Sequence, residues 1–183
     1  ACFVAACRAI GPARVDFERL CVTGLSMGAQ AAWGLALRHG AQLAAAAPMA
    51  GRCAWRGDAW GEEDRIFEQL RALPIRAFSV QEDTTSYAWR DFVWLATRRG
   101  HEGAPASGPP ARVRARDGGE SVASAHDWGP RLRLTLFSEH RDDHNCWDLV
   151  YQEEEHFGLF SWMASCRNPD GAALASPPRA EHA

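Results

Sequence analysis

One pentapeptide constrains this chain more than any other stretch: residues 24–28 read Gly-Leu-Ser-Met-Gly. The apolar residues 20–23 before it are typical of a strand, and the small and apolar residues after it favour a helix over 27–39. In this setting G-x-S-x-G predicts a sharp turn that exposes a serine hydroxyl at the end of a parallel sheet. An ordinary Gly-Ser turn is the alternative, but the flanking strand and helix favour Ser26 as a nucleophile.

The two glycines of the pentapeptide have a steric explanation. Where the strand and the helix nearly touch, a side chain would collide with the backbone of the neighbouring element. We therefore expect that neither Gly24 nor Gly28 tolerates a side chain.

The rest of the chain alternates strand patterns with amphipathic helix patterns. Further strands are expected at 42–48, 74–80 and 131–137, and further helices at 1–10, 62–73, 85–99 and 149–166. The alanine-rich run 42–48 also favours a helix, but it is short and ends at Pro48, which fits a buried strand better. This alternation predicts an α/β fold, a parallel sheet of about four strands flanked by helices.

Two segments depart from the alternation. Residues 100–130 are rich in Gly, Pro, Ser and Arg, and we expect an exposed, disordered insertion there, with a lid as an open alternative. Residues 167–183 carry three prolines and are expected to form a flexible tail. The predicted organisation is one partial α/β domain over 1–166, followed by that tail.

Composition excludes several classes of protein. The chain has 183 residues, 46% hydrophobic residues and a net charge of −3, which fits one domain with a sizeable core and indicates no nucleic-acid partner. No apolar run approaches the ~18 residues of a membrane span. Six cysteines without a C-x-x-C pair argue against zinc and thioredoxin-like sites. We expect mostly buried free thiols; disulfides and the compartment stay open, with the cytoplasm slightly favoured.

A nucleophilic serine needs a histidine to accept its proton and a carboxylate to orient that histidine. On this kind of sheet the acid and then the histidine follow the serine in the chain, each after a strand. Asp83 follows the strand at 74–80 and is the favoured acid, with Glu82 as the alternative. Asp83 also fits a simple cap of the next helix.

The histidine is expected after the strand at 131–137. His144 is favoured and His140 is its rival, since both lie in the loop that follows. The remaining histidines are expected on helix surfaces or in mobile segments: His39, His156, His101, His126 and His182.

Residues 19–48 resemble the phospholipase/carboxylesterase and predicted-peptidase branch of the α/β-hydrolases, through the pentapeptide, Trp33 and the alanine-rich run. Asp83 matches the acid of that family's H-G-x-x-D motif, although the His-Gly is absent. His144 and Trp147 match its H-x-x-W motif, and residues 159–163 echo its closing segment. The resemblance covers roughly residues 10–99 and 131–165.

The resemblance implies a serine hydrolase that cleaves a small carboxylic ester or thioester through an acyl-enzyme, with no metal and no organic cofactor. It implies Ser26 as nucleophile, His144 as base, Asp83 as its partner and the Met27 N–H as one donor of the oxyanion hole.

The family also has strands before the pentapeptide and a second oxyanion donor among them, whereas 25 residues precede Ser26 here. We therefore expect the C-terminal portion of such a fold, which needs the N-terminal part or a partner strand along its exposed edge. A non-catalytic, truncated or degenerate copy is the alternative.

Overall fold

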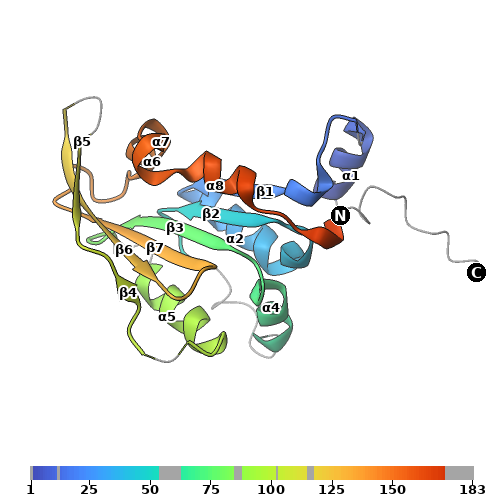
Figure 1. The fold of residues 1–183 in the computed structure, drawn as a ribbon, viewed down its shortest axis with the longest axis horizontal. Helices are drawn as coiled ribbons and strands as arrows, with labels where there is room; N and C mark the ends of the chain where they lie inside the picture. The colour runs from blue at the N-terminus through green and yellow to red at the C-terminus, as the bar shows by residue number, and fades with distance from the viewer. Residues whose placement is uncertain are drawn as a thin grey trace, which may run out of the picture.

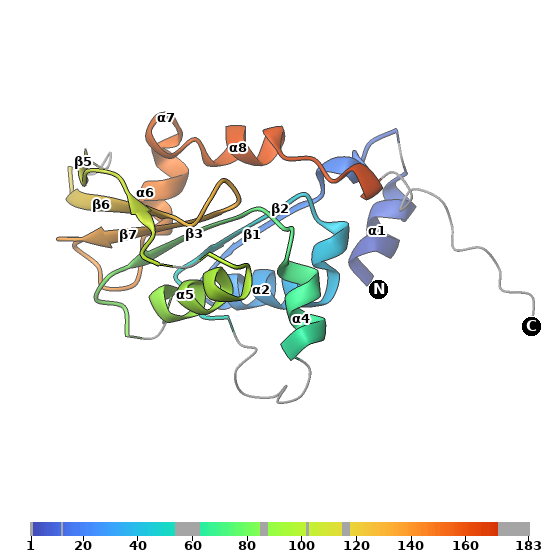
Figure 2. The ribbon, with the colours of Figure 1, turned by 60° about the horizontal axis from the view of Figure 1, so that its bottom comes forward.

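The computed structural model describes residues 2–11, 13–53, 63–84, 88–101, 103–114 and 118–171. A seven-stranded sheet lies at the centre, with helices on both faces (Figures 1 and 2). One face is covered by three helices, and Figure 2 shows them below the sheet: α2 (Met27–His39), α4 (Glu63–Leu70) and α5 (Ala88–Arg98). The other face carries three shorter helices: α6 (Trp147–Gln152), α7 (Glu154–Phe157) and α8 (Leu159–Ser165). Another described α-helix, α1 (Cys2–Ile10), lies to one side.

The strand order is β1-β2-β3-β7-β6-β4, with β5 paired to β6. The first four are parallel to one another and are the four predicted strands: β1 (Cys21–Leu25), β2 (Ala45–Met49), β3 (Ile75–Val80) and β7 (Leu132–Ser138). The predicted α/β fold with a flanked parallel sheet is confirmed, and the ambiguous alanine-rich run is a strand whose residues are all buried.

The prediction of a disordered insertion at 100–130 is wrong for the described part of that segment. It contains β4 (Ala106–Ser107), β5 (Ala111–Arg114) and β6 (Glu120–Asp127), which extend the sheet with antiparallel pairs. The composition of this segment suggests disorder because it has few large apolar residues. In the structure β6 instead buries small residues, such as Ser121 and Ala123. The ladder to β7 holds the strand, and an ion pair between Arg133 Nε and Asp127 at 2.6 Å holds its end.

Two boundaries near the C-terminus also differ from expectation. The single helix expected at 149–166 is three short helices, since the helical conformation is interrupted at Glu153 (φ −104°, ψ +54°) and at Gly158, which is left-handed (φ +55°). The expected tail begins with ordered residues: Arg167 pairs with Glu18 at 2.7 Å, and Asn168 Nδ2 donates to the Ala41 carbonyl at 2.7 Å. Residues 172–183 of that tail lie outside the described residues.

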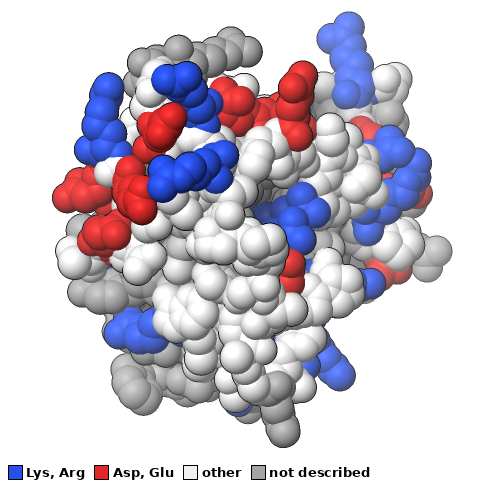
Figure 3. Space-filling view, turned by 60° about the vertical axis from the view of Figure 1, so that its left-hand side comes forward, with Lys and Arg blue, Asp and Glu red and all other residues white. Residues whose placement is uncertain are grey.

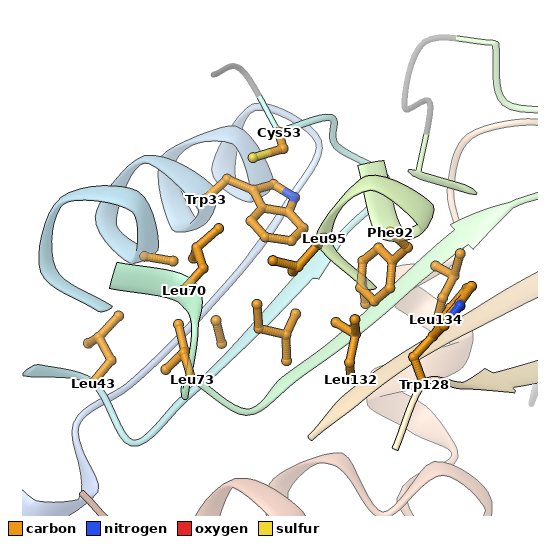
Figure 4. Close-up of a cluster of buried hydrophobic side chains, with 14 of the residues drawn as sticks. Trp33, Leu43, Cys53, Leu70, Leu73, Phe92, Leu95, Trp128, Leu132 and Leu134 are labelled. Atoms are coloured by element: carbon orange, nitrogen blue, oxygen red, sulfur yellow. The ribbon is translucent and has the colours of Figure 1, made fainter. Parts of the chain in front are cut away.

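The core consists of two apolar clusters, one on each face of the sheet. Alternate side chains of β3 divide between them: Ile75 and Ala77 face α2, α4 and α5, whereas Phe78 and Val80 belong to the cluster beneath α6–α8. Figure 4 shows the first cluster, where Trp33 of α2 and Phe92 of α5 lie together over the sheet. Burial on both faces accounts for the nearly continuous apolar character of the parallel strands.

The strand that leads into the pentapeptide, β1, lies at one edge of the sheet, as expected. Among the described residues it pairs with β2 alone, and its residues are only partly buried, whereas those of β2 are fully buried. Within the described residues, the outer backbone groups of β1 are not paired with a strand.

The steric prediction holds for one glycine of the pentapeptide and fails for the other. A Cβ on Gly24 would lie 2.3 Å from the Gly28 carbonyl oxygen, whereas a Cβ on Gly28 would meet no atom within 4 Å. Only Gly24 is therefore crowded. The lack of a side chain there allows the backbone of α2 to approach β1, whereas Gly28 contributes its carbonyl group to this contact.

This difference predicts effects of different size for two matched substitutions. Gly24→Ala is expected to lower the free energy of unfolding by about 2–3 kcal/mol, because the strand and the helix must separate to make room. Gly28→Ala is expected to stay within about 1 kcal/mol of the parent, since alanine favours a helix. Urea denaturation of both variants measures the difference, and equal losses would contradict this explanation.

Acidic and basic side chains are interspersed on the face shown in Figure 3, rather than gathered into a basic patch. Arg112 of β5 lies 3.6 Å from Glu139, the residue after β7, and Arg114 of β5 lies 3.9 Å from Glu120 of β6. Among the described helices, none has the length and apolar character needed to cross a membrane.

Candidate active site

Backbone strain gathers at the carboxyl ends of the parallel strands. Among the described residues, three that are not glycine have a positive φ: Ser26 (+51°), Ala50 (+48°) and Glu139 (+54°). Each of them directly follows a parallel strand, namely β1, β2 and β7. Unfavourable conformations of this kind persist where the surroundings enforce them, and they cluster at functional sites. The carboxyl end of the parallel strands is therefore the candidate location of an active site.

Ser26 is held by its backbone, which leaves its side chain available. Its N–H donates to the Met49 carbonyl of β2 at 2.9 Å, and its own carbonyl accepts the N–H groups of Ala29 and Gln30 at 3.0 and 3.2 Å. A serine in front of a helix usually caps that helix with its hydroxyl. Here the hydroxyl makes no such bond, and the backbone of Ser26 is strained (φ +51°, ψ −116°).

The structure brings together the three side chains singled out in the sequence. Ser26 Oγ lies 2.9 Å from His144 Nε2, and Asp83 Oδ2 lies 2.8 Å from His144 Nδ1. The Asp83 side chain is only 2% exposed, whereas that of His144 is 34% exposed. Since a carboxylate only accepts hydrogen bonds, the imidazole presents Nδ1–H to Asp83, which leaves Nε2 to accept the serine proton.

The loop that carries His144 is fixed by its neighbours. Asp142 Oδ1 accepts the backbone N–H groups of Asn145 and His144, each at 2.9 Å. These two bonds, that of Asn145 first, lower the pKa of the Asp142 carboxyl. The Trp147 ring meets the imidazole edge to face at 5.5 Å. The histidine is thus oriented before any ligand arrives. The sequence could have indicated this role, because an Asp side chain often accepts the backbone N–H of the residue two positions later, which here is His144.

His140, the rival histidine, has a different place. Its Nδ1 lies 2.6 Å from Ser121 Oγ on β6, and its Nε2 donates to the Asn145 carbonyl at 2.5 Å. It therefore connects β6 to the loop of His144 instead of approaching Ser26. Sequence reasoning missed Ser121, because the segment that contains it was expected to be disordered.

In the described part of the chain, no hydrogen bond joins the Ser26 hydroxyl to the alternative acid Glu82, to His126 or to the cysteine of the His144 loop, Cys146. Glu82, the alternative acid, is exposed, whereas its neighbour Asp83 is buried. The Cys146 thiol is fully buried, which raises its pKa to about 12 and keeps it protonated. His126 bonds to Ser107 at 2.9 Å. Among the described residues, no three His, Cys, Asp or Glu side chains converge as a metal site would require.

The backbone after the serine offers one donor to a developing negative charge. Met27 is the first residue of α2, where N–H groups have no acceptor within the helix, and its side chain is 80% exposed. The positive end of the helix dipole adds to the attraction for an anion at this point. A second donor, expected from the resemblance, is not identified among the described residues.

A hollow of about 510 Å³ opens beside Ser26 and His144. We call it the Ser26 hollow and define it by its described lining residues: Ser26, Gln30, Ala50, Gly51, Arg52, Thr84 and His144. It joins the ends of β1, β2, β3 and β7, so a ligand held there lies next to both the hydroxyl and the imidazole.

No family model matches this sequence, and no curated protein matches it. Among solved structures, the chain is similar to one described as a thermostable esterase, with a TM-score of 0.53 and 19% sequence identity. The match covers 84% of this chain and 32% of the esterase, so the chain spans about a third of that protein's length. The chain has an esterase-like α/β fold.

Proposed function

We propose that this chain carries the catalytic centre of a serine hydrolase that cleaves carboxylic esters or thioesters through an acyl-enzyme. The hydrogen-bonded series from Ser26 through His144 to Asp83 carries the proposal, with distances of 2.9 and 2.8 Å. Its position after strained turns at the carboxyl end of the sheet supports it, as does the esterase-like fold. The phospholipase/carboxylesterase branch is part of the proposal and rests on the sequence resemblance.

The proposed reaction uses these three side chains in turn. Ser26 Oγ attacks the carbonyl carbon while His144 Nε2 accepts the hydroxyl proton, and the oxyanion that forms accepts the Met27 N–H. The carbon–oxygen bond to the alcohol then breaks, and His144 returns the proton to the departing oxygen. Water attacks the acyl group on Ser26 by the same route, with His144 accepting its proton and then protonating Ser26 Oγ. Asp83 keeps Nδ1 protonated and stabilises the imidazolium in both halves.

A second candidate is a non-catalytic hydrolase half-domain that associates with another polypeptide segment along β1. The edge position of β1 favours it. A missing oxyanion donor slows acyl transfer by about 10²–10³-fold, which is enough to suppress turnover. In that case the chain alone hydrolyses a short p-nitrophenyl ester only slowly. Fast hydrolysis that disappears in Ser26→Ala would exclude this candidate.

Labelling with a fluorophosphonate tests the proposal without assuming a substrate. The probe is expected to modify the folded chain at Ser26, found by peptide mapping, and to lose essentially all of that signal in Ser26→Ala, since only an activated hydroxyl displaces fluoride at a useful rate.

Ser165→Ala is the matched control for labelling, because Ser165 is an exposed serine whose hydroxyl donates to the Trp162 carbonyl at 2.7 Å. This variant should label like the parent. Absence of label at Ser26 in folded chain, or equal labelling of Ser26→Ala, would reject the proposal.

A further inference from the structure

We propose that Arg52 makes the Ser26 hollow selective for esters that carry a carboxylate, so that the arginine binds the anionic group while Ser26 meets the ester carbonyl. This deepens the proposed function and rests on it. Arg52 is an exposed side chain that lines the same hollow as Ser26 and His144. The guanidinium group offers a planar fork of N–H donors that matches a carboxylate.

The chemistry of the lining favours a polar, anionic ligand. Of the described residues that line the hollow, none is acidic and none has a large apolar side chain. The polar ones besides Ser26, His144 and Arg52 are Gln30 and Thr84. The nearby Asp83 carboxylate faces His144 and is 2% exposed, so it does not neutralise the arginine. No hydrogen bond or ion pair joins Arg52 to the described part of the chain.

The backbone around Arg52 is held at three flanking residues, two before it and one after it. The Ala50 N–H donates to the Phe78 carbonyl at 2.8 Å, and Trp33 Nε1 donates to the Gly51 carbonyl at 3.2 Å. The Cys53 N–H donates to Asp91 Oδ2 at 2.9 Å, and Asp91 is 4% exposed. A buried carboxylate is costly to maintain, and here it fixes the segment that presents the arginine.

The same segment is pressed against the nucleophile. A Cβ on Gly51 would lie 2.7 Å from the Ser26 carbonyl oxygen and 2.5 Å from the Ala29 Cβ, so only glycine allows this approach. The position of Arg52 relative to Ser26 is therefore set by packed backbone on both sides. An arginine presented by so rigid a segment loses little conformational freedom in its backbone when it binds.

Binding of half-esters to the Ser26→Ala protein tests the proposal without turnover. Monomethyl succinate and monomethyl glutarate are compared with their dimethyl esters by NMR titration at constant ionic strength. The half-esters are expected to bind about tenfold more tightly than the diesters. This factor corresponds to the lower end of the free energies of hydrogen bonds to charged groups, because Arg52 is open to water. Adding Arg52→Ala should reduce the ratio to about one, and Arg52→Glu should invert it.

Arg38→Ala is the matched control, since Arg38 is exposed at the far end of α2 from Ser26, and it should keep the tenfold ratio. Equal binding of half-ester and diester, or a preference that survives Arg52→Ala, would overturn the proposal. Its failure is separable from that of the hydrolase proposal. Ser26 labelling without a half-ester preference rejects only the role of Arg52, and a preference without labelling rejects only the chemistry.

Discussion

Replacing His144 by alanine is expected to slow the reaction of Ser26 with a fluorophosphonate by about 10³–10⁴-fold. The Ser26 proton has one acceptor in the described structure, His144 Nε2 at 2.9 Å, and without it the hydroxyl stays a poor nucleophile. The second-order rate of labelling, followed by intact mass, measures the effect. Far-ultraviolet circular dichroism shows whether the variant remains folded.

His140→Ala is the matched control for that experiment. His140 supports the loop through Ser121 and Asn145 without contacting Ser26, so its loss should displace His144 slightly and reduce the rate by about 10–100-fold at most. If the rate survived His144→Ala and collapsed in His140→Ala, the assignment of the base would be wrong.

Asp83→Asn is expected to have the second-largest effect, a fall of about 10³-fold or more in the same labelling rate. The Asp83 carboxylate accepts Nδ1–H of His144 at 2.8 Å, whereas an asparagine amide can instead donate to Nδ1. The ring would then carry its proton on Nε2, where it can no longer accept a proton from Ser26. The fold should persist because the substitution keeps the shape of a buried side chain.

Glu82→Gln provides the control within the same turn. Glu82 is exposed beside Asp83, so its neutralisation should change the labelling rate less than twofold. A large loss in Glu82→Gln together with normal labelling in Asp83→Asn would move the acid to position 82.

The residues of the candidate site could be read from the sequence because each follows a recognisable strand. Ser26 lies in a turn with its own signature, and Asp83 and His144 lie in the loops after β3 and β7. The choice of His144 over His140 could not be made from position alone. It depends on Ser121 and Asn145, which hold His140 away from the serine.

The antiparallel strands β4, β5 and β6 could not be predicted from the composition of their segment. A strand can be stable with small residues facing the core when a neighbouring ladder satisfies its backbone, as β7 does for β6. The crowding at Gly24 but not at Gly28 is another detail that a motif does not contain, because it depends on how closely the Gly28 carbonyl approaches Gly24.

The hydrogen bond between Ser26 and His144 joins residues 118 positions apart, and three strand interfaces separate β1 from β7. A slip of one residue at any of these interfaces turns side chains to the opposite face and separates the pair. A compact state that keeps its helices and strands without native register therefore carries an inert hydroxyl. Reactivity at this one serine thus reports native assembly of the whole parallel segment, which spectroscopic measures of secondary structure do not.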